Sequence, residues 1–258
     1  MTTKPKIWKE LILTDSYFPE EDKPSINCVY KTIKKIRPDG ITLAGDIGNW
    51  DTFSRHSRFS PPKCHWTDSQ FLENSQHEYD SINLFLDTID KLVPKARKRF
   101  LWGNHENWVD DFIAESKKSR APQFDITERL MLKERGYTTY PYGEIVSLGK
   151  LRITHGLYTT QNHSKKHVEM MGRSILYGHC HDIQVCSKTT PENISHMAWC
   201  IGCLCNLNPD YLRGKPQNWN HGFAIVYLHP DSMFQVDVKR ITKGKVMVQG
   251  KLLDGNKK

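Results

Sequence analysis

Short apolar runs alternate with helical patterns through the first half of the chain, and this order most constrains its fold. The runs Leu11–Leu13, Ile41–Ala44 and Arg99–Trp102 have the length and composition of buried strands. Between them, Ser25–Ile36 and Asp68–Val93 carry apolar residues at helical spacing, and each ends just before a proline. This order predicts an α/β sheet with functional side chains at the carboxyl ends of its strands.

The second half of the chain is richer in expected strands and predicts a second sheet. Helices are expected over Asn107–Lys118 and Asp125–Arg135. The expected strands are Leu151–Thr154, Ser174–Tyr177, Ile183–Lys188, Met197–Cys200, Gly222–Leu228 and Phe234–Arg240. No composition break divides the chain, so one domain over residues 1–258 is expected, with a flexible, frayed tail over 249–258.

Composition narrows the class of protein. Hydrophobic residues make up 38% of the 258 residues, enough to bury a core. No apolar stretch approaches the ~20 residues that span a bilayer. The N-terminus reaches acidic residues too early for a secretory signal, and seven cysteines are an odd number, so reduced thiols and a cytoplasmic location are expected. The net charge of +8 favours polyanionic partners such as nucleic acid or nucleotides.

Polar side chains gather where five of the expected strands end. Carboxylates and imidazoles from separate strand ends suit divalent transition metals, and two such ions can activate water and hold a phosphate. Each segment alone is weak evidence for a metal site, because an Asp after a strand often caps a helix and a lone His often has a structural role. The five segments are Leu13–Tyr17 with Asp15, Ala44–Asn49 with Asp46, Trp102–Glu106 with Asn104 and His105, Ile153–Gly156 with His155, and Tyr177–His181 with His179 and His181.

Taken together, these segments resemble the calcineurin-like metallophosphoesterase superfamily. Their order is Asp-x-x, Gly-Asp, Gly-Asn-His-Glu, His-Gly and Gly-His-x-His, and it runs from about Leu11 to His181. The stretch from Gly202 to Trp219 is also similar to small members from bacteria and bacteriophages. The resemblance implies a four-layer αββα sandwich with a dinuclear metal centre.

The resemblance also implies a role for each site residue. His105 would lie beyond the metals, where it protonates the leaving oxygen or stabilises the charged phosphoryl group. Two divalent ions are implied, with manganese favoured and zinc, iron or nickel as alternatives. By this resemblance Asp46 bridges both ions, Asp15 and His181 complete metal site 1, and Asn104, His155 and His179 complete metal site 2.

One position departs from the family pattern. The first motif usually reads Asp-x-His, but here Tyr17 stands where the histidine ligand is expected. Tyr17 then ligates the metal directly, leaves site 1 with fewer protein ligands, or lowers metal occupancy until activity falls. We favour the second interpretation, because Asp15, Asp46 and His181 still provide three ligands. Asn49 is a candidate to support the ligands, or else an ordinary loop amide.

The stretch from Trp50 to Trp66 is a candidate border of the substrate cleft. Arg55, His56 and Arg58 alternate there with aromatic residues, a mixture that can meet phosphates and stack on bases. The alternative is a loop that packs its aromatic side chains onto the fold.

The function favoured by these observations is a metal-dependent phosphoesterase that hydrolyses phosphodiesters of nucleic acid or nucleotides, as a nuclease does. If the chain is phage-encoded, it would act in the host cytoplasm. One alternative is a phosphomonoesterase acting on nucleotides or phosphoproteins. Another is a weakly active or inactive nucleic-acid-binding relative, which the departure at Tyr17 suggests. The core motifs alone do not separate these functions.

Three cysteines near the end of the expected core, Cys200, Cys203 and Cys205, form a Cys-x-x-Cys-x-Cys pattern. A zinc knuckle or a redox pair is one interpretation. The other interpretation is that the cysteines serve as small apolar residues on a strand and the turn after it. We favour this second interpretation, because the sequence contains no matching second cluster.

Overall fold

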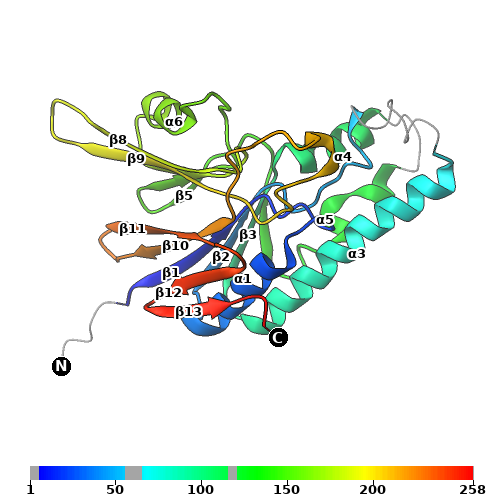
Figure 1. Ribbon diagram of the computed structural model, residues 1–258, viewed down its shortest axis with the longest axis horizontal. Coiled ribbons are helices and arrows are strands. Elements are labelled where there is room, and N and C mark those ends of the chain that lie inside the picture. Colours follow the sequence, from blue (N-terminus) through cyan, green and yellow to red (C-terminus); the bar gives the residue numbers. More distant parts are fainter. Residues whose placement is uncertain (1–5, 56–65, 116–120, 258) are drawn as a thin grey trace.

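The computed structural model describes residues 6–55, 66–115 and 121–257 of the 258-residue chain. Two β-sheets lie face to face, and helices cover their outer faces (Figure 1). The first sheet has six strands in the order β11-β10-β1-β2-β3-β4, and the second has five in the order β5-β6-β7-β9-β8.

The first sheet combines a parallel centre with an antiparallel edge. Strands β1 to β4 are parallel, and β10 and β11 extend the sheet beyond β1 in antiparallel pairing. Because the parallel strands share one direction, their carboxyl ends meet at one edge. The bounds are Trp8–Leu13 for β1, Gly40–Ala44 for β2, Arg97–Leu101 for β3, Tyr137–Tyr140 for β4, Gly222–Leu228 for β10 and Phe234–Arg240 for β11.

The second sheet also has a parallel centre, formed by β6, β7 and β9. Strands β5 and β8 pair antiparallel at its two edges. The bounds are Val146–Leu148 for β5, Leu151–Ile153 for β6, Ile175–Tyr177 for β7, Ile183–Thr189 for β8 and Ser195–Ile201 for β9.

Side chains that alternate along each strand build two cores. Leu11 and Leu13 of β1 pack against helices α1 (Lys23–Ile36) and α3 (Asp68–Leu92). Ile12 faces the other way and packs between the two sheets. On the far side, helix α6 (His163–Met171) covers the second sheet. The layers therefore run helix, sheet, sheet, helix, which confirms the expected αββα sandwich (Figure 1).

Several element boundaries differ from those expected. Helix α4 (Asn104–Glu115) begins three residues earlier than predicted, and α5 covers only Ile126–Arg129. Strands β4 and β5 and helix α6 were not predicted, because short strands and a mixed polar helix leave little periodic pattern. The described residues also form two 3₁₀ helices, η2 at Ala121–Phe124 and η3 at Asp210–Leu212.

The expectation of a frayed tail is wrong for its central residues. Lys251–Asp254 forms strand β13, which pairs antiparallel with β12 (Lys245–Val248). The hairpin lies against α1, where the Asn27 side chain donates a hydrogen bond to the carbonyl of Gly255 at 3.0 Å. Backbone pairing and this contact hold the segment in place. None of the helices in the described ranges combines the length and apolar character needed to cross a bilayer.

Candidate metal centre

The five expected segments follow β1, β2, β3, β6 and β7, so both sheets contribute to one site. Their side chains meet there, as the sequence predicts. The Nε2 atom of His155 lies 3.2 Å from Oδ2 of Asp46 and 3.1 Å from Oδ1 of Asn104. The Nε2 atom of His181 lies 3.3 Å from Oδ1 of Asp15.

On one side of the site, the side chains of Asp46, His155 and His179 lie close enough together to hold a metal ion. One ligand atom from each of these residues lies within 4.8 Å of the other two. The Nδ1 atom of His155 is 3.0 Å from the carbonyl of Ala44, to which it can donate a hydrogen bond. That bond turns Nε2 toward Asp46, and Nε2 can bind a cation once its own proton is released, as in histidines that bind metals. Asn104 adds an amide oxygen to the same group.

The side formed by Asp15, Tyr17 and His181 is linked by hydrogen bonds. The Tyr17 hydroxyl donates to Oδ2 of Asp46 at 3.0 Å and lies 3.1 Å from Nε2 of His181. Oδ2 of Asp15 accepts from the Thr14 hydroxyl at 2.6 Å and from the His179 amide at 2.8 Å. Oδ1 of Asp15 is buried and faces Nε2 of His181 at 3.3 Å. Tyr17 therefore lies inside the candidate site and touches two of the expected ligands.

His105 is positioned with one ring nitrogen turned to the site. Its backbone amide donates to Oδ1 of Asp46 at 2.9 Å, and its Nδ1 atom lies 2.5 Å from the carbonyl of Asn49. The ring stacks on Trp108 with centroids 3.7 Å apart and meets Tyr17 edge to face. Nε2 is left facing Asp46, 3.9 Å from its Oδ2 atom. Asn49 thus orients His105 through its backbone carbonyl.

Glu106 supports the site, although the sequence assigned it no role. Its side chain is fully buried, so its carboxylate must find its hydrogen-bond donors within the protein. It follows His105 in the Gly-Asn-His-Glu motif, which is the signal that could have pointed to it. Its oxygens accept from the backbone amides of Asp46, Ile47, Gly48 and Gly103 and from Nε1 of Trp50, at 2.8 to 3.3 Å. These bonds fix the turn that carries Asp46 against the start of α4.

The backbone around the site takes unusual conformations. Residues in the left-handed region are Asp15, Tyr17, Asp46, His179 and His181, with φ between 50° and 68°. Outside glycine this region is sparsely populated, and such residues concentrate at functional sites. Gly103 is needed for a different reason, because a Cβ atom there would lie 2.0 Å from Oδ1 of Asp46.

The charges of the site depend on one another. Burial raises the pKa of Asp46, but the neighbouring His155 and His105 lower it well below its usual range. Burial lowers the pKa of His155, and the opposing charge of Asp46 overrides this and raises it to about 10. Burial and Asp15 act on His181 in the same way, and its pKa is raised to about 9. Burial, followed by the charge of Asp46, raises the pKa of the Tyr17 hydroxyl well above its usual value.

The candidate substrate residues are only partly placed by the structure. Arg55 is exposed and forms an ion pair with Glu115 at the end of α4. His56 and Arg58 lie outside the described residues. Trp50 and Phe53 are fully buried and pack around Tyr79, so these two aromatic residues are not available to stack on bases. For them, packing onto the fold is the interpretation that holds.

Comparison with known proteins finds similarity in three dimensions only. No protein-family model matches the chain, and no curated protein matches its sequence. A predicted phosphoesterase from Streptococcus pneumoniae is 17% identical, with 91% of this chain and 90% of that chain covered and a TM-score of 0.36. Vacuolar Protein Sorting 29 from Cryptosporidium parvum is 10% identical, with 96% and 98% covered and a TM-score of 0.47. A dimetal phosphatase from Danio rerio is 11% identical, with 90% and 96% covered and a TM-score of 0.45.

Proposed function

We propose that this protein is a metal-dependent phosphoesterase of the calcineurin-like type, with a dinuclear centre at the edge where the two sheets meet. The observation that carries the proposal is the convergence of Asp46, His155 and His179 within 4.8 Å, beside the Asp15–His181 pair. Carboxylate, amide and imidazole ligands drawn from separate strand ends are the set that such a centre requires.

The side chains present fit two divalent ions. Oδ1 of Asp15 is a buried carboxylate oxygen paired with Nε2 of His181 at 3.3 Å, and a cation bound to both atoms would take the place of the imidazole proton. Asp46 presents its Oδ2 atom between His155 and Tyr17, at the centre of the group. We propose that Asp46 is shared by both ions, that Asp15 and His181 complete the first set, and that Asn104, His155 and His179 complete the second. Manganese is the favoured ion, since the carboxylate and amide oxygen donors suit it, and zinc, iron or nickel, which imidazole donors suit, are the alternatives.

Two bound cations would supply Lewis-acid activation and neutralise the charge that develops during phosphoryl transfer. The protein's own contribution beyond these ligands is His105. Its Nε2 atom faces the centre while Nδ1 is held by Asn49, so a proton on Nε2 can pass to a departing alkoxide oxygen. Burial lowers the pKa of His105, and a phosphate anion bound beside Nε2 would favour the protonated form.

The proposed substrates are phosphodiesters of nucleic acid or nucleotides. The net charge of +8 supports a polyanionic substrate, because a basic surface attracts one over a long range. The buried Trp50 and Phe53 remove part of the argument for base stacking, so the charge is the main support.

The test is hydrolysis of bis-p-nitrophenyl phosphate against p-nitrophenyl phosphate, after chelator treatment and during titration with Mn²⁺. Metal-dependent cleavage that favours the diester supports the proposal. Faster cleavage of the monoester would make the protein a phosphomonoesterase. Cleavage of neither, with metal bound, would contradict a phosphoesterase function. The Asp46→Asn variant, purified in parallel, controls for a contaminating hydrolase.

A further inference from the structure

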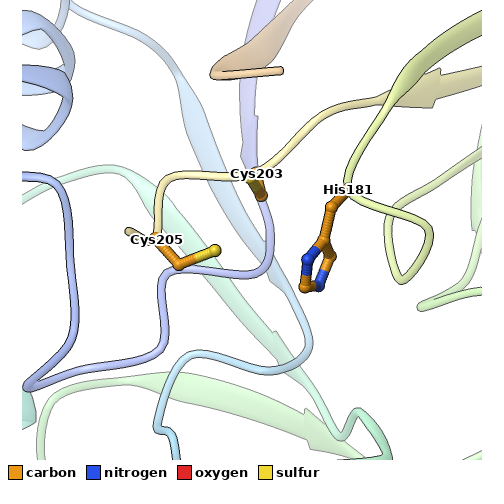
Figure 2. A group of neighbouring side chains, drawn as sticks. All are labelled: His181, Cys203 and Cys205. Atoms are coloured by element: carbon orange, nitrogen blue, oxygen red, sulfur yellow. The ribbon is translucent and has the colours of Figure 1, made fainter. Parts of the chain in front are cut away.

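A second group of metal-binding side chains, consisting of His181, Cys203 and Cys205, lies beside the candidate centre. One ligand atom from each lies within 4.8 Å of the other two. Figure 2 shows the His181 ring and the Cys205 side chain turned toward one another, with Cys203 beside them. All three residues are buried, with exposed fractions of 5% for His181, 0% for Cys203 and 4% for Cys205.

The backbone holds the two cysteines on one side of their loop. In an extended strand, residues two apart point alike, but the loop after β9 bends at Leu204 between two isolated β-bridges. The Leu204 amide donates to the carbonyl of Asp15 at 3.0 Å, and its carbonyl accepts from the Asp22 amide at 2.8 Å. The Cys203 and Cys205 sulfur atoms lie within 4.8 Å of each other. The loop is thus fixed to the turn that carries Asp15.

His181 has a ring nitrogen to offer to this group. Its Nε2 atom contacts Asp15 and Tyr17, whereas Nδ1 is buried without a hydrogen-bond partner in the part of the chain that the structure describes. With the proton on Nε2, directed to Asp15 or Tyr17, the Nδ1 lone pair is free. Metal-binding histidines commonly donate their second N–H to a carboxylate in this way. A buried polar nitrogen without a partner otherwise costs free energy, which a bound cation would recover.

We propose that Nδ1 of His181 and the sulfur atoms of Cys203 and Cys205 bind a zinc ion, with a fourth position open to water or another ligand. Two thiolates and an imidazole form a set typical of Zn²⁺, and thiolates disfavour Mn²⁺. Binding releases the two thiol protons to solvent. The Zn²⁺ ion, the two thiolates and the neutral imidazole together then carry no net charge. Neither cysteine belongs to the proposed dinuclear centre, but His181 does, so a zinc ion on Nδ1 and a first-set ion on Nε2 are alternative uses of one imidazole.

The first test uses Co²⁺ as a spectroscopic substitute for zinc on the reduced, chelator-treated protein. Bound Co²⁺ should produce a thiolate-to-cobalt charge-transfer band in the near ultraviolet, and added Zn²⁺ should remove it. The Cys203→Ser/Cys205→Ser variant should lack the band, while Cys186→Ser, a change on strand β8 outside the group, should keep it. A reduced wild-type protein without the band, or a double variant that retains it, would overturn the proposal.

The second test needs no cysteine variant, so misfolding of the double variant does not affect it. The Asp46→Asn protein is loaded with one equivalent of Zn²⁺ and studied by X-ray absorption. Sulfur neighbours at about 2.3 Å support the thiolate site, and a shell of only nitrogen and oxygen at about 2.0–2.1 Å contradicts it. The phosphoesterase proposal is judged separately, by the activity of the wild-type protein. Sulfur ligation in Asp46→Asn together with an inactive wild type would support this site and contradict the phosphoesterase proposal. An active wild type without sulfur ligation in the variant would contradict this site alone.

Discussion

The residues on the two sides of Asp46 lie on similar turns after strands, but their side chains interact in different ways. On one side, His155 and His179 present nitrogens to Asp46 in a metal-sized group. On the other, the Tyr17 hydroxyl bonds to Asp46 and lies against His181, so that a hydrogen-bond network connects the residues. Tyr17 makes both of the contacts that set this side apart.

The comparison teaches that the two sides should differ in metal affinity. On the side with His155 and His179, one ligand atom from each residue already lies within 4.8 Å of the others, and Tyr17 meets this group only at the shared Oδ2 of Asp46, so a cation there would compete with the hydroxyl at one atom. On the Tyr17 side, a cation must compete with the hydroxyl for Asp46 and His181. We therefore expect the side with His155 and His179 to bind its ion first, and the side with Asp15, Tyr17 and His181 to bind one only at higher metal concentration.

The largest effect is expected from Asp46→Asn, because Asp46 belongs to both sides. The amide keeps the shape of the side chain but removes the negative charge that both cations need. Metal content should fall at both sets, and the rate should fall by more than about 100-fold, since losing even an outer partner of a ligating histidine costs about 10–100-fold. Elemental analysis and steady-state rates check this, and full metal content in the variant would refute a shared carboxylate.

His105→Ala should separate catalysis from metal binding. We expect both sides to keep their metal and the rate to fall by ~10²–10⁴-fold, the usual span for a general acid. The loss should be smaller for substrates with good leaving groups, which need less protonation. Rates across a series of phenyl phosphodiesters, measured with metal content, test this. A variant that loses metal would show that His105 is a ligand instead.

Glu106→Gln should loosen the turn shared by both sides. The glutamine NH₂ group would face backbone N–H groups that now donate to a carboxylate oxygen, so these N–H groups would lose their acceptor. We expect the free energy of unfolding to fall by about 1–3 kcal/mol. Urea denaturation measures this, with the exposed Glu73→Gln on α3 as a matched control expected to change little. Equal stability of the two variants would mean that the Glu106 contacts contribute little.

Metal binding should release protons, because His155 and His181 have pKa values raised to about 10 and about 9. A cation needs the neutral imidazole, so apparent affinity should increase as the pH rises from neutrality toward these values. Calorimetry in buffers of different ionisation enthalpy counts the protons released. Binding that is independent of buffer and pH would show that the histidines are already neutral or do not bind the cation.

The smallest effects are expected at Tyr17, and they concern one side only. Tyr17→Phe should leave the metal content of the His155 side unchanged, since its hydroxyl is not a ligand there. Tyr17→His should add a nitrogen donor beside Asp15 and His181 and lower the Mn²⁺ concentration needed for full activity. Metal titration of the rate distinguishes the variants. Loss of metal in Tyr17→Phe, or a purple tyrosinate-to-iron band in the wild type, would instead indicate direct ligation.

The sequence predicted the parts of the molecule that depend on local pattern. The strands before Asp15 and Asp46 are short apolar runs, and their parallel pairing brings their ends together. The strand before His155 is also a short apolar run, but it lies in the second sheet, and the packing of the two sheets brings its end to the same site. The contact of Cys203 and Cys205 with His181 could not be predicted in this way, because it depends on how the loop after β9 lies against the turn after β1. Periodicity within a segment contains no information on such pairing.

Burial of the aromatic residues after β2 also depended on tertiary structure. Trp50 and Phe53 alternate with basic residues in a pattern that fits a nucleic-acid surface equally well. Their position under α3, beside Tyr79, is set by a helix that begins more than ten residues later. Composition therefore predicted the chemistry available in this loop but not the direction of its side chains.

The left-handed turns limit which residues can replace the expected ligands. Among residues other than glycine, asparagine, aspartate and histidine tolerate this conformation best, and they are also oxygen and nitrogen donors. Backbone geometry and metal chemistry therefore select the same few amino acids at Asp15, Asp46, His179 and His181. Tyr17 is the bulky exception, with φ of 55°. A library that randomises these positions and is screened only for folded protein should recover mainly glycine and the same three amino acids, and a further screen for metal binding should remove glycine.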